Sequence, residues 1–223
     1  MRTMKVVAGA VLVVLITACG SSTPPLTLPK TNSNHTPTSS AAGPHPAKVP
    51  ATGTIGFLGC SNTDDAVLGY EKDVNGPGRF WDIHSGYGGG AISDWANSDM
   101  YWALFEAQLA KHPVVAIWWH LCMHPHTTQA EVDAVFARLR QDVGPSVPIY
   151  VSAMASYSAA GECPMADPAG SEVFYHQLIS SGKVLPGPVL TPLSPQNTKP
   201  DGCHPQKSAL LSDGQRLKAF FGS

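Results

Sequence analysis

Three residues in two widely separated segments of this 223-residue chain could together perform nucleophilic catalysis. Ser61 follows an apolar stretch in "LGCSNT", and Asp201 and His204 stand three apart in "DGCHP". A serine hydroxyl becomes an effective nucleophile when an adjacent base takes its proton during the attack. His204 is the candidate base, and Asp201 is the candidate group that fixes the imidazole tautomer and stabilises the imidazolium. The chemistry that such a set performs is acyl transfer.

The elements that must bring these residues together alternate between strands and helices. Apolar, β-prone runs predict strands, and helical spacing with a Thr128–Glu131 capping box predicts helices. We expect strands over 54–59, 79–84, 113–119, 148–154 and 187–190, and helices over 100–112, 128–143, 171–182 and 206–221. This alternation predicts an α/β fold, a three-layer α/β/α sandwich with a mainly parallel sheet. In such sheets the functional residues collect at the carboxyl ends of the strands.

Three short blocks at those strand ends resemble the SGNH hydrolases, the GDSL-type esterase family. "GCSNT" resembles the first family block, with Cys60 in place of its aspartate, and "DGCHP" matches the C-terminal Asp-x-x-His block closely. "GGGAISDW" resembles the second block, and Gly90 is its best match to the oxyanion-hole glycine. The resemblance covers 53–223 in element order and implies a flavodoxin-like sandwich. It also implies a Ser61–His204–Asp201 triad, with Ser61 and Gly90 amides as oxyanion donors.

One family feature is missing from the sequence. The family has an oxyanion asparagine after its third strand, but here that stretch reads "WWHLCMHPH". Cys122 falls closest to the expected position, and His120 is a candidate substitute donor. Loss of one such donor can lower kcat by about 10²–10³.

The cysteines predict disulfides that bear on the same blocks. Four remain after Cys19, an even number that in an exported chain suggests two bridges and permits three pairings. On the fold that the resemblance implies, Cys60 next to Ser61 and Cys203 next to His204 would come together. We therefore expect Cys60–Cys203 and Cys122–Cys163 bridges.

The N-terminal part of the chain is predicted to lie outside the fold. Residues 1–18 have a basic start and a short apolar run typical of a secretory signal. "ITAC" resembles the lipobox of bacterial lipoproteins, which would make Cys19 a lipidated first residue. Residues 19–52 are rich in Ser, Thr and Pro and predict a disordered tether. The remaining 53–223 would be one extracytoplasmic domain, held at a membrane by its lipid anchor.

Charge and composition narrow the possible partners. Residues 53–223 carry 10 Lys and Arg and 16 Asp and Glu, a formal charge of −6, which argues against a nucleic-acid partner. The histidines near Cys122 (His120, His124 and His126) match no zinc signature, so we expect no metal and no cofactor. A thiol oxidoreductase is disfavoured because the chain has no Cys-x-x-Cys motif.

The sequence thus predicts a monomeric serine esterase that hydrolyses O-acyl esters on small molecules, or on carbohydrate or envelope substrates. The substrate class depends on compartment and on family analogy. Two alternatives stay open. An O-acyltransferase would use the same triad with another acceptor. A cell-surface binding module would have kept the fold and lost catalysis with its oxyanion asparagine.

Overall fold

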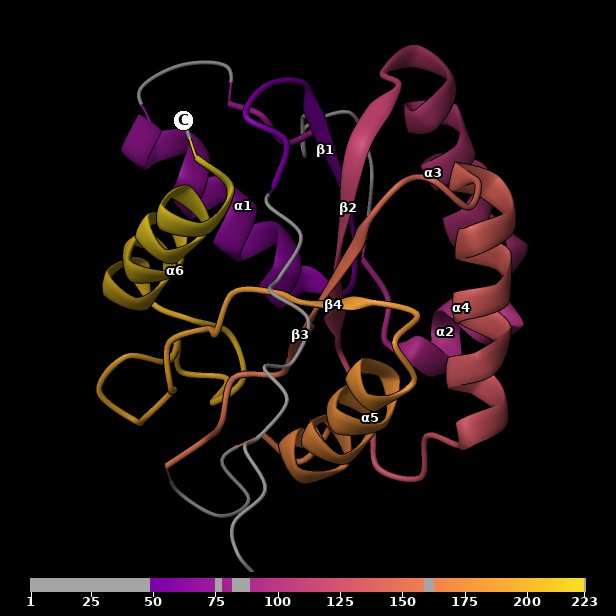
Figure 1. The fold of residues 1–223 in the computed structure, drawn as a ribbon. Coiled ribbons are helices and arrows are strands. Elements are labelled where there is room, and N and C mark those ends of the chain that lie inside the picture. The colour runs from indigo at the N-terminus through magenta and orange to yellow at the C-terminus, as the bar shows by residue number, and fades with distance from the viewer. Residues whose placement is uncertain (1–48, 75–77, 82–88, 159–162, 223) are drawn as a thin grey trace, which may run out of the picture. The chain divides into compact units, whose positions relative to one another are not determined.

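The computed structural model describes residues 49–74, 78–81, 89–158 and 163–222, and they form a mixed α/β fold (Figure 1). A four-stranded, all-parallel sheet lies at its centre, and its strands are neighbours in sequence order. The strands are β1 (Thr54–Leu58), β2 (Val114–Leu121), β3 (Ile149–Ala153) and β4 (Leu185–Pro186). The prediction of an α/β fold with a parallel sheet is confirmed.

Helices cover both faces of the sheet. They are α1 (Ser61–Val74), α2 (Ile92–Asn97), α3 (Asp99–Lys111), α4 (Gln129–Val143), α5 (Pro168–Ser180) and α6 (Lys207–Phe221). In Figure 1, α1 and α6 lie on one side of the sheet and α2, α3 and α4 on the other. The expected capping box is present at the start of α4, where Thr128 and Glu131 satisfy each other's backbone amides. The result is a three-layer α/β/α sandwich.

The hydrophobic core lies between the central sheet and the helices on its two faces. Strand β2, "VVAIWWHL", is buried over its last six residues, as expected for a strand covered on both faces. All five tryptophans of the chain are at most 2% exposed. They fill the interior between sheet and helices, so none of them offers a surface on which a sugar ring could stack.

Helices α1 and α6 are held close together by glycine. A Cβ atom added at Gly69 would lie 2.0 Å from the carbonyl oxygen of Leu210, and one at Gly214 would lie 2.2 Å from the carbonyl carbon of Gly69. Neither position can carry a side chain without separating the helices. This contact fixes the first helix of the domain against its last, and it places the chain before α6 beside the start of α1.

Some expected boundaries differ from the structure. The short edge strand β4 lies at 185–186, and 187–190 is not a strand, so that prediction was wrong. Helix α5 begins three residues earlier than expected, because Asp167 caps it by accepting from the Gly170 amide at 2.9 Å. Of the strand expected at 79–84, Phe80 forms a parallel bridge with Ile55, and residues 82–84 lie outside the described residues.

The two disulfides join different pairs from those expected. Cys60 is bonded to Cys122, and Cys163 to Cys203. The first pairing follows from strand order: β1 and β2 are neighbours with Leu58 opposite Trp119, so the residues just beyond both strands meet. The predicted Cys60–Cys203 and Cys122–Cys163 bridges were therefore wrong. In the chain-entropy model, each observed bridge stabilises the fold by about 4 kcal/mol.

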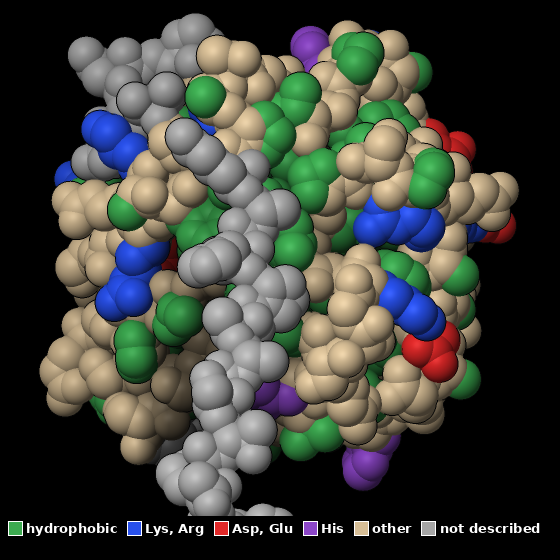
Figure 2. Space-filling model, in the orientation of Figure 1, with side chains coloured by type: hydrophobic (Ala, Val, Ile, Leu, Met, Phe, Trp, Pro, Cys, Tyr) green, Lys and Arg blue, Asp and Glu red, His purple; other side chains and the backbone are tan. Residues whose placement is uncertain are grey.

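The N-terminal predictions lie outside the described residues, which begin at position 49. The signal peptide, the lipidated Cys19 and most of the tether therefore stay predictions. Within the part of the chain that the structure describes, no helix has the length and apolarity needed to span a membrane. On the face shown in Figure 2, the Lys and Arg side chains of the described residues lie in separate groups and form no continuous basic patch.

Candidate active site

Ser61 is held at a tight turn between the first strand and the first helix. Strand β1 ends at Leu58, and α1 begins at Ser61. The turn is closed by the Cys60 amide, which donates to Thr63 Oγ1 at 2.9 Å, and by the Thr63 amide, which donates to the Cys60 carbonyl at 2.8 Å. Gly59 is needed here because a Cβ atom would lie 2.1 Å from Thr63 Oγ1. The exposed Ser61 thus stands at a helix N-terminus, at the carboxyl edge of the sheet.

The structure brings Ser61, His204 and Asp201 together. Ser61 Oγ lies 2.8 Å from His204 Nε2, and His204 Nδ1 lies 2.7 Å from Asp201 Oδ2. The other carboxylate oxygen, Asp201 Oδ1, accepts from the backbone amides of Cys203 at 2.8 Å and of His204 at 3.0 Å. These amides, together with the His204 side chain, hold the pKa of Asp201 at about 2.

The low pKa of Asp201 decides the proton positions in this chain of hydrogen bonds. An ionised carboxylate can only accept, so His204 Nδ1–H must be the donor to Asp201. In a neutral imidazole the other ring nitrogen then carries a lone pair, and Nε2 accepts from the Ser61 hydroxyl. This is the tautomer that a general base for Ser61 requires.

The turn that carries His204 is fastened to its surroundings at the residue before it. The carbonyl of Cys203 accepts from the Tyr157 hydroxyl at 2.8 Å and from Asn62 Nδ2 at 3.2 Å, and the Cys203 side chain is bonded to Cys163. Asn62 and Tyr157 were not foreseen from the sequence. The position of Asn62 directly after Ser61 was a usable signal, whereas nothing in the sequence distinguishes Tyr157.

An ion pair adds a further link between the segment that carries Asp201 and His204 and the helix that begins at Ser61. Lys199 Nζ lies 3.1 Å from Asp65 Oδ2, and this joins the segment before Asp201 to the N-terminal part of α1. Both side chains are partly exposed, so the pair contributes at most about 1 kcal/mol. The pair therefore makes only a small contribution to holding the two segments together.

One of the two backbone amides expected as oxyanion donors is already engaged in the structure. The Gly90 amide donates to the Gly59 carbonyl at 2.8 Å and is not free for a substrate, so its predicted role was wrong. Among the hydrogen bonds of the described residues, none is donated by the Ser61 amide. That amide lies at the N-terminus of α1, where the helix dipole also favours negative charge.

His120 does not serve as a substitute donor. Its ring is 1% exposed, its Nδ1 lies 2.8 Å from Thr63 Oγ1, and it stacks on Trp118. Burial lowers the pKa of His120 to about 3, so the ring is neutral. It supports the turn beneath Ser61 from the core side and is not among the residues that line the pocket at Ser61. The prediction of His120 as a donor was therefore wrong.

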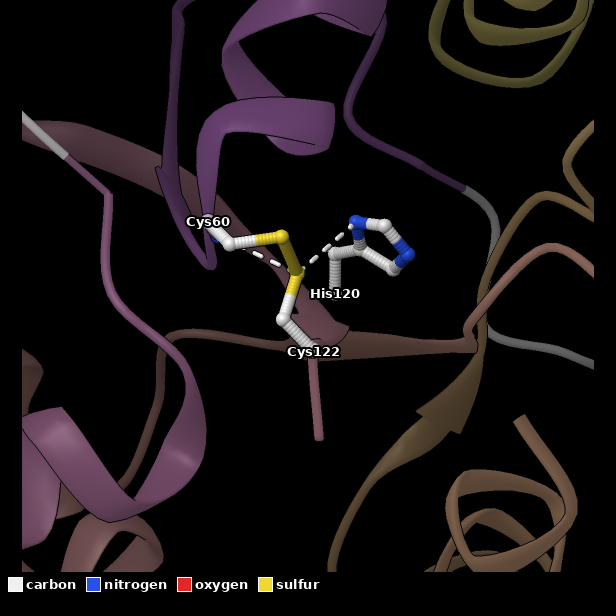
Figure 3. A group of neighbouring side chains, drawn as sticks. All are labelled: Cys60, His120 and Cys122. Carbon is white, nitrogen blue, oxygen red and sulfur yellow. Dashed lines mark hydrogen bonds between the residues drawn. A yellow bond between two sulfur atoms is a disulfide. The ribbon is translucent and has the colours of Figure 1, made fainter. Parts of the chain in front are cut away.

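A group of possible metal ligands lies next to the site. One ligand atom each from Cys60, His120 and Cys122 falls within 4.8 Å of the others (Figure 3). Both sulfur atoms are bonded to each other, so neither is available as a thiolate. As it stands in the structure, the group is a partly buried disulfide next to a neutral imidazole.

A pocket of about 170 Å³ opens beside Ser61 and His204. It is also lined by His124, which follows the end of β2, and by Gly89 and Gly90 of the glycine-rich segment. Ser61 is thus open to a ligand, and its neighbours leave room for an acyl group.

Asp64, on the first turn of α1, has an unusual environment. Burial, and then the neighbouring charge of Asp65, raise the pKa of Asp64 to about 7, although the Gly89 amide opposes the shift by donating to the carboxylate. In the unfolded chain the same group titrates near 3.8. Between these two pKa values the folded state therefore binds one proton more than the unfolded chain does. The contribution of Asp64 to folding stability is complete below its pKa in the unfolded chain and is lost as the pH rises through 7.

Replacing Asp64 with asparagine should remove the loss of folding stability that accompanies ionisation of Asp64. Between pH 4 and pH 8 we expect the variant to gain stability relative to the wild type, on the order of 2 kcal/mol. Thermal unfolding across this range would measure it, with Asp133→Asn on the exposed side of α4 as the control. Parallel stability curves for wild type and Asp64→Asn would contradict the expected titration.

Comparison with known proteins adds little to this geometry. No family model matches the chain, and no curated protein matches it either. Among solved structures, a protein from Bacteroides fragilis described as a "putative acylhydrolase" is similar at 13% sequence identity with a TM-score of 0.45. The similarity covers 78% of this chain and 88% of that one. At that level it does not decide the function, and the site's own geometry must.

Proposed function

We propose that this chain is an extracytoplasmic serine ester hydrolase of the SGNH type. The observation that carries the proposal is the continuous chain of hydrogen bonds from Ser61 Oγ through His204 to Asp201, at 2.8 and 2.7 Å. Ser61 is exposed at the mouth of a pocket, whereas a purely structural serine–histidine contact has no need of one. Asp201 would orient His204, which would act as the base.

The proposed reaction has two halves. In the first, Ser61 Oγ bonds to the acyl carbon while its proton passes to His204 Nε2, and the alcohol leaves with that proton. In the second, water attacks the acyl-enzyme, His204 accepts a proton from the water and returns it to Ser61 Oγ, and the free acid departs. The negative charge on the acyl oxygen in each half would be stabilised by the Ser61 amide at the start of α1. His124 is the candidate side-chain donor in place of the family's asparagine.

The proposed substrates are O-acyl esters on small molecules, or on carbohydrate or envelope components. The lipobox-like "ITAC" supports a membrane anchor on Cys19, and the two disulfides fit an oxidising compartment. We propose a monomer that needs no cofactor. An O-acyltransferase would differ only in replacing the attacking water with another hydroxyl.

A non-catalytic binding module is the second candidate. It is favoured by the commitment of the Gly90 amide to Gly59 and by the half-cystine, Cys122, at the position expected for an oxyanion asparagine. Such a protein would bind an ester without turning it over.

Reaction with a fluorophosphonate separates these candidates. The esterase should be modified at Ser61, identified by peptide mass spectrometry, and should hydrolyse p-nitrophenyl butyrate until it is modified. His204→Ala should slow the labelling by at least about 10²-fold, because the base is lost. If Ser61 stays unlabelled and ester turnover equals the uncatalysed rate, the binding module becomes the better explanation.

A further inference from the structure

The pocket beside Ser61 has an unusual lining. Its volume is about 170 Å³, and both disulfides contribute to its wall. The other lining side chains, apart from the site residues already described and Asp94, are apolar or contain sulfur: Ala91, Met123, Met154, Met165 and Ala166. Thioether and disulfide sulfur is polarisable, and methionine side chains adapt to irregular apolar groups. The part of the wall formed by these side chains and the disulfides is therefore suited to a hydrocarbon.

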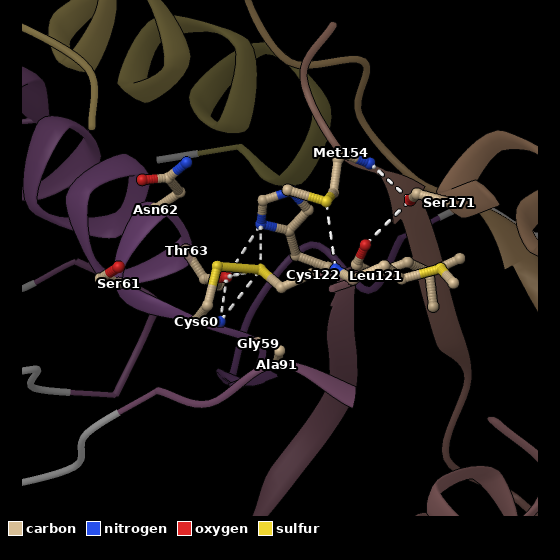
Figure 4. Close-up of a disulfide and its surroundings, with 12 residues drawn as sticks. Gly59, Cys60, Ser61, Asn62, Thr63, Ala91, Leu121, Cys122, Met154 and Ser171 are labelled. Atoms are coloured by element: carbon tan, nitrogen blue, oxygen red, sulfur yellow. Dashed lines mark hydrogen bonds between the residues drawn. A yellow bond between two sulfur atoms is a disulfide. The ribbon is translucent and has the colours of Figure 1, made fainter. Parts of the chain in front are cut away.

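The side chain of Met154 is fixed in place. Its Sδ accepts from the Met123 amide at 3.1 Å, and its own amide donates to Ser171 Oγ at 2.8 Å. Ser171 in turn donates to the Leu121 carbonyl at 2.8 Å. Figure 4 shows Met154 extending from β3 toward the end of β2, next to the Cys60–Cys122 disulfide. The apolar wall at this end of the pocket is thus preformed.

The charges around the pocket select against an anionic acyl group. Among the described residues that line it, none is Lys or Arg. The carboxylate in the lining, Asp94, accepts from the Ala91 amide at 2.8 Å and would repel a second negative charge. A dicarboxylic half-ester would therefore enter without a partner for its free carboxylate, at a high desolvation cost.

The size of the pocket gives the length of the acyl group. An apolar cavity of about 150 Å³ holds a benzene molecule, so a pocket of this volume fits a group of six carbon atoms, whereas an acetyl group would leave most of it empty. Building on the esterase function proposed above, we propose that the pocket binds an uncharged acyl chain of about four to eight carbons. The open side of the pocket would leave the alcohol part in solvent.

Binding can be measured apart from turnover in the Ser61→Ala variant, by calorimetry with p-nitrophenyl acetate and p-nitrophenyl hexanoate. Each fully buried methylene contributes about fourfold, so the hexanoate should bind roughly 10- to 100-fold more tightly in this partly open pocket. Ala166→Phe, added to Ser61→Ala, should abolish most of this preference by filling the pocket. Ala169→Phe, exposed on α5 and outside the lining, should leave it unchanged.

A second change guards against a folding defect in Ala166→Phe. Met165 is 61% exposed at the rim of the pocket, so Met165→Ala should fold normally. It should weaken hexanoate binding severalfold and leave acetate binding unchanged. Equal affinity for the two esters in Ser61→Ala, or equal effects of the Ala166 and Ala169 changes, would overturn the inference.

The same experiments separate this inference from the esterase proposal. If wild type turns over both esters but Ser61→Ala binds them equally, the esterase stands and the acyl pocket is refuted. If wild type turns over neither ester, while the hexanoate preference and its dependence on Ala166 persist, the pocket is supported and hydrolysis is refuted.

Discussion

Replacing Ser61 with alanine should lower kcat for ester hydrolysis by about 10⁴–10⁶, because removal of a triad nucleophile leaves only binding and oxyanion stabilisation. KM should change little, since the hydroxyl contributes mainly to the reaction itself. Ser61 is exposed, and among the described residues its side chain makes one hydrogen bond, to His204. The free energy of unfolding should therefore fall by no more than about 1 kcal/mol. Initial rates with p-nitrophenyl hexanoate and thermal unfolding measure the two quantities.

The matched control for this change is Ser208→Ala. Ser208 is exposed on the first turn of α6. Loss of its hydroxyl group should leave both kcat and the free energy of unfolding unchanged. A Ser61→Ala enzyme that keeps more than about 1% of the wild-type kcat would show that another group attacks the ester, because the nucleophile of a triad cannot be removed at so small a loss. The proposed acyl-enzyme at Ser61 would then be ruled out.

Asp201→Asn should lower kcat by about 10⁴ without loss of the fold. An asparagine oxygen at the position of Oδ1 can still accept from the Cys203 and His204 amides, so the turn keeps its shape. The amide nitrogen, however, would face His204 Nδ1 as a donor. His204 would then carry its proton on Nε2, facing Ser61, and could not accept another from the hydroxyl.

The fall in kcat caused by Asp201→Asn should be the same at every pH between 5 and 9. The pKa of Asp201 is about 2, so the wild-type carboxylate stays ionised from pH 5 to pH 9 and the rate ratio should not vary with its titration. Asp133→Asn makes the same charge change on the exposed side of α4 and serves as the control. A loss below about tenfold would mean that Asp201 does not set the tautomer, since a wrong tautomer alone costs far more.

The sequence predicted the fold class and the residues that meet at the site better than it predicted the details between them. Asp201 and His204 stand three apart, so one turn can present both, and the strand–helix pattern placed Ser61 at the same edge of the sheet. The distances agree with that arrangement. Their catalytic roles stay a prediction until the rates are measured.

The disulfide pairing could not be predicted from the expected contact between Ser61 and His204. Cys60 and Cys203 each precede a residue of the Ser61–His204 contact, but successive side chains along a chain point in different directions. The Cys60 side chain instead meets Cys122 at the end of the neighbouring strand, with 5.8 Å between the two Cα atoms. Strand order decides this pairing, and strand order was not available from the sequence.

The predictions of Gly90 and His120 as oxyanion donors were wrong for a related reason. Several glycines follow one another in "GYGGG", and composition does not tell which amide faces a substrate. Gly90 is used to close the loop onto Gly59. His120 was expected at the site because it follows the buried "IWW", but strand alternation turns its ring into the core, against Trp118.

The glycine contact between α1 and α6 bears on when the site can exist during biosynthesis. Ser61 lies on the first helix of the domain, whereas His204 precedes the last, and the two helices touch at Gly69 and Gly214. A nascent chain in which Ser61 has already been synthesised still lacks the helix that holds the segment of His204, its proposed base, in position. If the proposed hydrolysis is correct, it can begin only once α6 has been made, and a chain that stalls or is cut before α6 should be inactive toward esters.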